Sequence, residues 1–357
     1  MIIRTVTALV ASTTLLAACA THDGDAQGEG AAVTARLETP SVGTAGQDAA
    51  DDPAIWASSA PVRIGGVSTM GFVAGTDKKA GLYIYGLDGA VLQFLPEGLL
   101  NNVDLTGGLS VEGRPQVVLG ASDRTPGKTG VALYLFDPAG EAGVRPWGAI
   151  RSDVVEPYGF CFARRGAEVH AILVGHEGEV RQFVLAADAA GRPDAREVRR
   201  FKIGTISEGC AADEATDALY IAEENVGLWR YRLDPSGGDG RALVQPVTPG
   251  VLVADAEGLA VIEDGAARYL IGSSQGDSTF PVWRIDGPQP VFAGRFVVGT
   301  GEVDRVTGTD GVDALGGSVG AAFPEGLVVV QDDVNDAGTQ NFKYIDWRDI
   351  RAALGLN

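Results

Sequence analysis

Histidine and positively charged residues are scarce in this sequence, and their scarcity excludes several functions. The 357 residues include three histidines, too few for a histidine-rich zinc site. Lysine and arginine together number 28 against 47 acidic residues, so the formal net charge is −19. A protein with this charge is expected to repel nucleic acid and anionic lipid surfaces. We therefore predict that the protein has no nucleic-acid partner.

Cysteine is also rare, with three examples at Cys19, Cys161 and Cys210. Neither Cys161 nor Cys210 has an arginine six residues later, which excludes the cysteine-based phosphatases that need this spacing. Cys161 lies two residues after Gly159, whereas Cys210 follows Gly209 directly. Because side chains alternate between the two faces of a strand, we expect these cysteines to face opposite ways as buried free thiols. A disulfide between them would nevertheless be compatible with an exported protein.

The N-terminus has the pattern of an export signal. Arg4 supplies a positive charge, and the apolar stretch 6–18 is too short to span a bilayer. The run Leu16-Ala17-Ala18-Cys19 resembles a bacterial lipobox, which implies that Cys19 is the lipidated first residue of the mature protein. The alternative is an ordinary signal peptide that is cut nearby.

These patterns predict a signal peptide over residues 1–18 and a flexible Gly-rich tether over residues 19–32. No later segment is apolar enough to span a bilayer. We expect an exported, lipid-anchored protein of the outer membrane, on its periplasmic or cell-surface side, or otherwise a secreted protein.

Fifty glycines and seventeen prolines divide the remaining chain into short apolar runs with little helical periodicity. A polar residue, a glycine and an apolar run recur together, with the glycines at positions 159, 209, 258 and 326. A second element, headed by a glycine, recurs at positions 81, 130, 178 and 227. Repeats of about fifty residues, each with room for four short strands, indicate a β-propeller.

The predicted fold is therefore an all-β, six-bladed propeller with four-stranded antiparallel blades, formed by residues 33–357 as one domain. Residues 33–42 should pair into the last blade and close the ring, because an open array would leave exposed sheet edges. Residues 300–318 form an insertion in the sixth repeat, which is predicted to start its inner strand at Glu325-Gly326. Residues 348–356 are the one predicted helix.

The innermost strands of a propeller all start at the same end of the central channel. The repeat therefore predicts that polar residues far apart in the sequence converge there: Asp51, Asp52, Asp104, Tyr158, Glu208, Asp255 and Glu257. Crowded carboxylates repel one another unless a cation lies among them. A ring of oxygen ligands suits Ca²⁺, which we predict as the cofactor. For any single member, a solvated acidic turn is the alternative.

Four basic residues precede the second recurring element in their repeats, at Lys78, Lys79, Arg124 and His176. Each by itself is equally compatible with a solvated turn. Together they predict a basic rim around the acidic ring, which would suit a polyanionic phosphate ligand.

Two segments resemble the signature motifs of the β-propeller phytases, calcium-dependent enzymes that remove phosphate from phytate. They are Asp48-Ala49-Ala50-Asp51-Asp52-Pro53-Ala54-Ile55-Trp56 and Asn101-Asn102-Val103-Asp104. The resemblance extends over about residues 33–350. It implies a 3-phytase-type phosphoric monoester hydrolase that acts on the small-molecule substrate phytate, with several calcium ions, and we expect a monomer.

The resemblance also implies roles for individual residues. The catalytic set would be Glu208, Asp51, Asp52, Tyr158, Lys78 and Arg124. Substrate phosphates would be held by Lys78, Lys79, Arg124, Tyr158 and His176. The catalytic calcium ligands would be Asp51, Asp52, Glu208, Glu224, Asp255, Glu257, Gln275 and Asp310. Structural calcium would be bound by Asp304, Asp332 and Asn335.

The sequence departs from the family pattern at three of these places. His176 stands where relatives usually have lysine, so this contact would be uncharged at alkaline pH. Gly308 stands where relatives often have an acidic residue, and Asp123 replaces a common asparagine. Two other functions remain as alternatives. One is a non-catalytic surface lipoprotein that binds calcium or calcium phytate, and the other is a calcium-dependent propeller lactonase or esterase.

Overall fold

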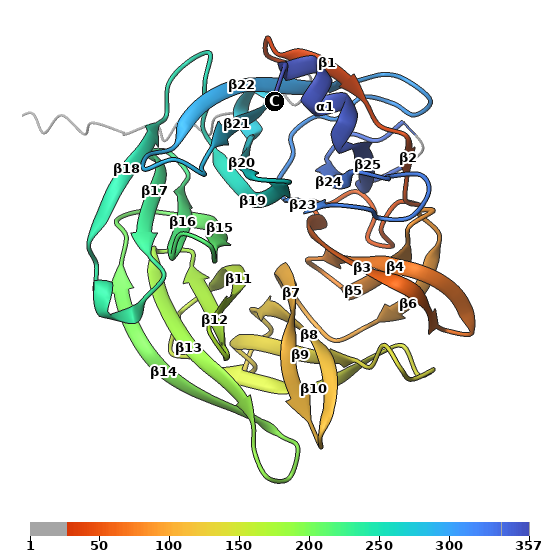
Figure 1. Cartoon of the computed structure of the whole chain (residues 1–357), viewed down its shortest axis with the longest axis vertical. Coiled ribbons are helices and arrows are strands. Elements are labelled where there is room, and N and C mark those ends of the chain that lie inside the picture. Colours follow the sequence, from red (N-terminus) through yellow and green to blue (C-terminus); the bar gives the residue numbers. More distant parts are fainter. Residues whose placement is uncertain (1–26, 337, 357) are drawn as a thin grey trace, which may run out of the picture.

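The computed structural model describes residues 27–336 and 338–356, which form a six-bladed β-propeller around a central channel (Figure 1). In each blade the strands follow one another outward from the channel in chain order, except that the N-terminal segment adds the outermost strand to two of the blades. The predicted all-β propeller with four-stranded antiparallel blades is confirmed. The predicted signal peptide and Cys19 lie outside the described residues. No helix within the described part is long and apolar enough to cross a membrane.

The blades follow one another along the chain. Blade 1 consists of β3 (Ala50–Ile64), β4 (Val67–Asp77), β5 (Gly81–Gly86) and β6 (Val91–Leu95). Blade 2 consists of β7 (Leu100–Val111), β8 (Arg114–Asp123), β9 (Gly130–Phe136) and β10 (Val144–Arg151). Blade 3 consists of β11 (Pro157–Arg165), β12 (Glu168–Gly175), β13 (Glu179–Ala187) and β14 (Pro193–Lys202).

Blade 4 consists of β15 (Ser207–Asp213), β16 (Ala218–Glu223), β17 (Gly227–Arg232) and β18 (Arg241–Pro246). Blade 5 consists of β19 (Ala256–Asp264), β20 (Ala267–Ser274), β21 (Phe280–Arg284), β22 (Val291–Gly299) and the added β1 (Ala31–Thr34). Blade 6 consists of β23 (Val312–Gly316), β24 (Gly326–Asp332), β25 (Asn341–Asp346) and β2 (Leu37–Glu38). Two short 3₁₀ turns cover Pro235–Gly237 and Gln275–Asp277.

The N-terminal segment closes the ring as predicted. Leu37 and Glu38 of β2 pair antiparallel with Tyr344 and Lys343 of β25, so the first and last parts of the chain share blade 6. The structure adds a contact that the sequence did not indicate, because β1 pairs in parallel with β22 of blade 5. Strand β1 begins at Ala31, so the propeller starts two residues before its predicted start at residue 33.

The prediction for the innermost strand of blade 6 was wrong. That strand is β23, which follows Asp310-Gly311, whereas Gly326 begins the second strand β24. Both segments fit the pattern of an acidic residue, a glycine and an apolar run, so the sequence alone left two choices. Glu325 does not face the channel and instead forms an ion pair with Arg351 of the C-terminal helix.

The recurring glycines have a steric cause. A Cβ atom added at Gly159 would lie 1.8 Å from the carbonyl oxygen of Glu208, and one at Gly209 would lie 2.2 Å from that of Glu257. A Cβ atom at Gly258 would similarly lie 2.8 Å from the Asp310 carbonyl oxygen. At each of these places the inner strand of the next blade approaches so closely that only glycine fits.

The prediction that Cys161 and Cys210 remain free was also wrong, because they form a disulfide. The two side chains do leave opposite faces of their own sheets, as strand alternation suggests. However, the blades stack face to face, so the face of blade 3 that carries Cys161 lies against the face of blade 4 that carries Cys210. Both residues belong to one apolar cluster that joins blades 3 and 4. Opposite orientation is therefore what brings the two sulfur atoms together.

The C-terminal helix α1 (Trp347–Leu354) starts one residue before the predicted helix and ends two residues earlier. The Asp346 side chain caps its N-terminus by accepting a hydrogen bond from the Arg348 backbone N–H. Trp347 and Ile350 are buried in the apolar cluster between blades 5 and 6. The helix thus covers the seam where the ring is closed.

Candidate active site

A β-bulge shapes the start of the innermost strand in five blades. The pairing between the first and second strands skips two residues in each: between Ala50 and Pro53, Leu100 and Val103, Pro157 and Phe160, Ser207 and Cys210, and Ala256 and Leu259. A bulge leaves the skipped residues without ladder partners and can redirect their side chains, and bulges are common next to active sites.

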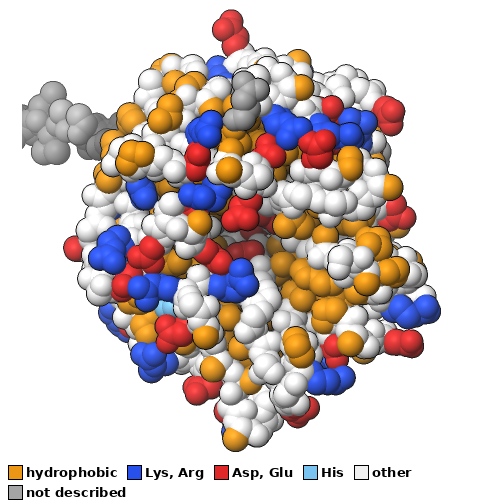
Figure 2. Space-filling model, viewed as in Figure 1, with side chains coloured by type: hydrophobic (Ala, Val, Ile, Leu, Met, Phe, Trp, Pro, Cys, Tyr) orange, Lys and Arg blue, Asp and Glu red, His pale blue; other side chains and the backbone are white. Residues whose placement is uncertain are grey.

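The first skipped residue of every bulge is polar, and these residues form a ring around the channel mouth. In blade 6, Asp310 stands in the same relation to β23, two residues before its first paired residue. The ring consists of Asp51, Asn101, Tyr158, Glu208, Glu257 and Asp310. Figure 2 shows acidic side chains gathered in a hollow near the middle of this face, with basic side chains beside them. Four of the residues predicted to converge lie in this ring, namely Asp51, Tyr158, Glu208 and Glu257. Asp52 and Asp104 instead line the channel, and Asp255 precedes β19. The ring also includes Asn101, to which sequence reasoning gave no role.

Three glutamates make the tightest acidic group. Carboxylate oxygens of Glu208, Glu224 and Glu257 lie within 4.8 Å of one another, and all three side chains are buried. Burial, followed by the charge of Glu208, raises the pKa of Glu224 to about 8. Burial is also the main cause of the raised pKa of Glu208 and of Glu257. Three buried carboxylates at this separation favour either protons or a cation.

A second acidic group adjoins the first and contains one lysine. The Lys78 ammonium nitrogen lies 2.8 Å from Asp310 Oδ2, 2.7 Å from Asp48 Oδ1 and 3.6 Å from Asp51 Oδ2. Burial alone would lower the pKa of Lys78, but the neighbouring carboxylates outweigh burial and raise it well above its usual value. For Asp51 and Asp310, burial raises the pKa more than the nearby positive charge of Lys78 lowers it. The pKa of each carboxyl therefore rises to about 7.

Two asparagines fix the Glu208 carboxylate. The Asn101 amide nitrogen donates to Glu208 Oε1 at 2.7 Å. In the amide orientation that satisfies its neighbours, Asn102 also donates to Glu208 Oε1 at 2.7 Å and to the Tyr158 carbonyl oxygen at 2.9 Å. Both asparagines are buried. These donors hold the Glu208 carboxylate beside those of Glu224 and Glu257.

The donor set of this site fits a hard cation. Every candidate ligand is an oxygen atom, as Ca²⁺ prefers. Neither Oδ1 nor Oδ2 of Asp51 accepts a hydrogen bond from any described residue, and neither does Glu257 Oε2, although all three atoms are buried. Unsatisfied buried carboxylate oxygens are costly, and a cation would satisfy them.

The remaining predicted catalytic-calcium ligands lie around this group. The Gln275 side-chain amide donates to Asp310 Oδ1. The Asp255 carbonyl oxygen accepts a hydrogen bond from the Gln275 backbone N–H at 3.0 Å. Glu224 is linked to the same region, since its carbonyl oxygen accepts from the Ala256 backbone N–H at 2.9 Å.

The predicted basic rim is only partly assembled. Arg124 Nη1 lies 3.5 Å from Glu156 Oε1, and the Tyr158 and His176 rings meet edge to face with centroids 5.1 Å apart. The charge of Glu208, followed by burial, raises the pKa of Tyr158, so its hydroxyl stays protonated. Lys79 is exposed, in contrast to the buried Lys78 beside it.

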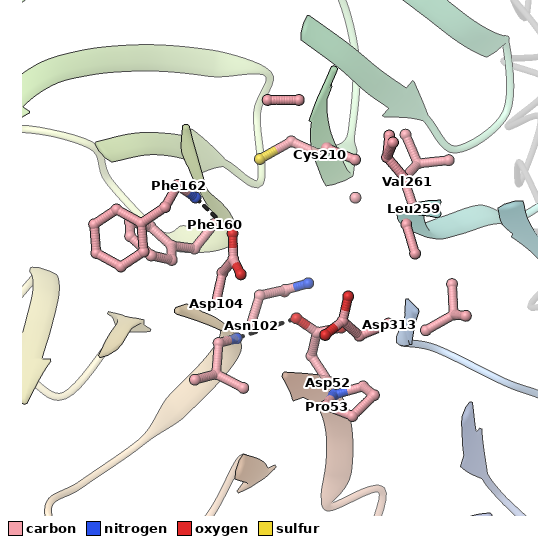
Figure 3. Close-up of a pocket in the computed structure, with 16 residues that line it drawn as sticks. Asp52, Pro53, Asn102, Asp104, Phe160, Phe162, Cys210, Leu259, Val261 and Asp313 are labelled. Atoms are coloured by element: carbon pink, nitrogen blue, oxygen red, sulfur yellow. Dashed lines mark hydrogen bonds between the residues drawn. The ribbon is translucent and has the colours of Figure 1, made fainter. Parts of the chain in front are cut away.

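Asp52 points into the channel below the ring. It lines a cavity of about 150 Å³ with Asp104 and Asp313, as Figure 3 shows. Asp52 Oδ2 accepts the Val103 backbone N–H at 3.1 Å, and Asp104 Oδ2 accepts that of Phe162 at 2.7 Å. Asp313 Oδ2 likewise accepts the Ile55 backbone N–H at 2.7 Å. Each of these carboxylates therefore joins the inner strands of two neighbouring blades.

The predicted structural-calcium residues lie near a buried lysine at the ring closure. The Lys343 ammonium contacts Asp304 Oδ1, lies 3.2 Å from Asp332 Oδ2 and lies 2.6 Å from Glu38 Oε2. The Asn335 amide donates to Ser41 Oγ at 3.3 Å. Lysine thus supplies positive charge to two of the predicted ligands, and calcium at this place stays a prediction.

A comparison with protein families gives one decisive match, in which the family described as Phytase covers residues 1–357. The chain belongs to the phytase family. This phytase is 34% identical to a 3-phytase of Bacillus subtilis (strain 168) over 335 aligned residues. The alignment covers 90% of this chain and 85% of the Bacillus protein.

Solved structures resemble the phytase more distantly. The SapL1 lectin in complex with α-methyl fucoside has a TM-score of 0.49 at 14% identity, over 82% of this chain and 94% of the lectin. A GH43_1 enzyme from Xanthomonas citri has a TM-score of 0.41 at 13% identity, over 67% of this chain and 86% of the enzyme. Likenesses this weak do not bear on the function of the phytase.

Sequence reasoning missed the residues that support the ring of the phytase. Asn101 and Asn102 were visible as a motif but had no assigned role, although their place in the repeat matches that of Asp51 and Asp52. Gln340 was also only a motif residue, yet its Oε1 accepts the backbone N–H groups of Ala49 and Ala50 at the start of β3. The signal that could have identified Asn101 is its spacing, because Asn101-Asn102-Val103 follows Asp51-Asp52-Pro53 after one repeat length.

Proposed function

We propose that this phytase releases phosphate from phytate by calcium-dependent hydrolysis, with calcium held at the carboxylates of the ring. The observation that carries the proposal is the group formed by Glu208, Glu224 and Glu257, whose carboxylate oxygens lie within 4.8 Å of one another. The adjacent Asp51 supports the same assignment, because its two buried carboxylate oxygens accept no hydrogen bond from a described residue. The name of the Bacillus relative, 3-phytase, supports the reaction.

Charge explains why a cation is needed. Each phosphate of phytate carries about −1.5 to −2 charges near neutral pH, taking the phosphate monoester groups of proteins as a guide. The chain itself has a net charge of −19. When bound, calcium would neutralise the carboxylates and would supply Lewis-acid stabilisation of the charge on a phosphoryl group. The residues proposed to hold it are Asp51, Glu208, Glu224, Asp255, Glu257, Gln275 and Asp310. Asp52 would instead support the inner strands, because its carboxylate lies in the channel and accepts the Val103 backbone N–H.

The chain's own groups position the substrate. Lys78 and Arg124 would supply charge-assisted hydrogen bonds to a phosphate next to the one that is cleaved. Tyr158 would donate a hydrogen bond from its hydroxyl, because its raised pKa keeps it protonated. Glu208, held at Oε1 by Asn101, would use Oε2 to orient the attacking water or a ligand.

In the proposed reaction the oxygen of water joins phosphorus and the bond from phosphorus to the inositol oxygen breaks. The alcohol that leaves takes up a proton, and inorganic phosphate is released. No bond to the enzyme is formed at any stage. Isolation of a phosphorylated enzyme after mixing with phytate would contradict this course.

Removal of calcium tests the proposal. Phosphate release from phytate should stop in excess EDTA and return when calcium is restored, with at least a roughly 100-fold difference between the two states. The measurement is inorganic phosphate over time, with phytate binding followed in parallel by calorimetry. Calcium-dependent binding without release would favour the non-catalytic alternative. Release of phosphate that EDTA does not affect would contradict the calcium dependence.

The acidity of the ring predicts an unusual dependence of stability on pH. In the folded protein the pKa of Asp51 and of Asp310 is raised to about 7, and that of Glu224 to about 8. In the unfolded chain the pKa of a carboxyl group is about 4. The folded state then binds more protons than the unfolded state between these limits, so metal-free stability should fall as pH rises from about 5 to about 8.

Calcium should remove this loss, because bound calcium compensates the carboxylates that ionise. The measurement is thermal unfolding at several pH values, in EDTA and with calcium. We expect the gain in melting temperature from calcium to be larger at about pH 8 than at about pH 6. A gain that is the same at both values would contradict the assignment of these carboxylates.

We further propose that the protein is a monomer that is exported and anchored through a lipid on Cys19. The Cys161–Cys210 disulfide supports export, because disulfides persist in oxidising compartments. Expression of Cys19→Ala in a bacterial host should shift the protein from the membrane fraction to the soluble fraction, as followed by immunoblotting. An unchanged membrane fraction would contradict the anchor, and light scattering would test the monomer.

A further inference from the structure

The disulfide joins two blades that share no strand pairing. Cys161 lies in β11 and Cys210 in β15, the innermost strands of blades 3 and 4, and their Cα atoms are 5.7 Å apart. Their separation of 49 residues equals one repeat of the propeller. Both side chains are buried, and Cys210 also lines the channel cavity (Figure 3). It is the one disulfide among the described residues and thus cross-links two blades that are otherwise linked covalently only by the backbone between them.

The bond lies next to two residues of the ring. Tyr158 is three residues before Cys161, and Glu208 is two residues before Cys210. Both Tyr158 and Glu208 are in bulges, where they have no ladder partner in their own blade. Besides the asparagines that hold Glu208 and the His176 ring beside Tyr158, contacts across the seam between blades 3 and 4 help to fix their positions. One such contact is the close approach of Gly159 to the Glu208 carbonyl oxygen.

The repeat shows what the position of Cys161 does in other blades. Counted from the bulge, Cys161 is equivalent to Asp104 in blade 2 and to Asp313 in blade 6. Asp104 reaches the Phe162 backbone of the next blade, and Asp313 reaches the Ile55 backbone of the next blade. In three of the six blades this position thus ties one inner strand to the next, directly below the ring. Blade 3 uses a covalent bond where the other two use a hydrogen bond.

We propose that the Cys161–Cys210 bond is a positioning element that holds Tyr158 and Glu208 at a fixed separation across the seam of blades 3 and 4. It thereby preorganises the place where calcium and substrate phosphate meet. This inference rests on the proposed calcium-dependent function. Without the bond, the two bulges can shift relative to each other, and calcium binding must restore their arrangement at a cost in affinity.

The test compares the wild-type protein with Cys161→Ala, Cys210→Ala and the double variant. Calorimetry gives the calcium dissociation constant, and steady-state kinetics give kcat and KM for phytate. We expect calcium affinity to fall roughly 3- to 10-fold in all three variants, with activity largely restored at saturating calcium. Equal effects in the singles and the double variant would show that the bond, rather than either side chain, is responsible.

A matched control separates positioning from general stability. Trp147→Phe removes a hydrogen bond from Trp147 Nε1 to the Gly191 carbonyl oxygen, which links blades 2 and 3 away from the ring. This control should lower the melting temperature without a change in calcium affinity. If a cysteine variant does not fold, the same measurements on folded wild-type protein reduced by a water-soluble phosphine give the comparison.

The possible failures are distinguishable. A cysteine variant that melts at lower temperature but binds calcium as tightly as the wild type would overturn the positioning role. A wild-type protein that neither binds calcium nor needs it for phosphate release would overturn the proposed function first.

Discussion

Replacement of Glu208 by glutamine is expected to lower kcat for phosphate release from phytate by roughly 10²- to 10³-fold. Glu208 lies at the centre of the acidic group, since Asn101 donates to one of its oxygens and the carboxylates of Glu224 and Glu257 lie beside it. Glutamine keeps the size of the side chain but removes the charge and one acceptor oxygen. A neutral amide is a poor substitute for a carboxylate toward calcium.

The same substitution should not unfold the protein. Burial already raises the pKa of Glu208, so its charge is unfavourable in the metal-free state. We therefore expect the metal-free melting temperature of Glu208→Gln to equal or exceed that of the wild type, with a smaller increase on addition of calcium. Glu263→Gln is the matched control, because Glu263 is exposed near the far end of β19. Retention of more than about a third of the activity by Glu208→Gln would contradict its role.

Replacement of Lys343 by methionine is expected to lower the free energy of unfolding by about 3–5 kcal/mol. The Lys343 side chain is fully buried, and so is that of Asp332, while the Asp304 side chain is 9% exposed. Loss of the ammonium would leave these carboxylates together without a compensating charge. Their repulsion would act on the contact between β25, the N-terminal strand β2 and the loop before β23, which closes the ring.

Denaturant unfolding measures this effect, with Lys128→Met as a control at an exposed turn. Added calcium supplies a second readout. If Asp304, Asp332 and Asn335 bind structural calcium as predicted, calcium should recover part of the lost stability in Lys343→Met. A loss of less than about 1 kcal/mol would show that the buried lysine does not stabilise the closure.

The sequence was sufficient for the architecture because the repeat is a local property. Each blade requires short apolar strands, turns between them and a glycine where the next inner strand approaches, and these requirements recur about every fifty residues. Gly159, Gly209 and Gly258 are required because the backbone of the next blade comes too close for a side chain. Their spacing in the sequence therefore reflects the packing of neighbouring blades. The N-terminal closing strand could be predicted for a related reason, since an unclosed ring would expose its edges.

The predictions that were wrong concern strand register and side-chain contacts between neighbouring blades. Asp310-Gly311 and Glu325-Gly326 were equivalent as sequence, and only the pairing of β23 with β24 decided between them. The disulfide was missed because alternation describes one strand, whereas the bond joins the facing sides of two stacked blades. The position of Lys343 between two predicted calcium ligands was likewise not visible from spacing.

By itself the sequence determined that the chain forms a propeller and that acidic residues gather at one end of its channel. Periodicity carries that information, because equivalent places in a repeat occupy equivalent places in the ring. Only the tertiary structure decided which residues face one another there. The two-residue bulges direct Asp51, Asn101, Tyr158, Glu208 and Glu257 to the channel mouth, where Asp310 joins them, while Asp52 turns into the channel. A bulge is defined by the pairing of two strands, so its effect on a side chain arises only when the strands meet.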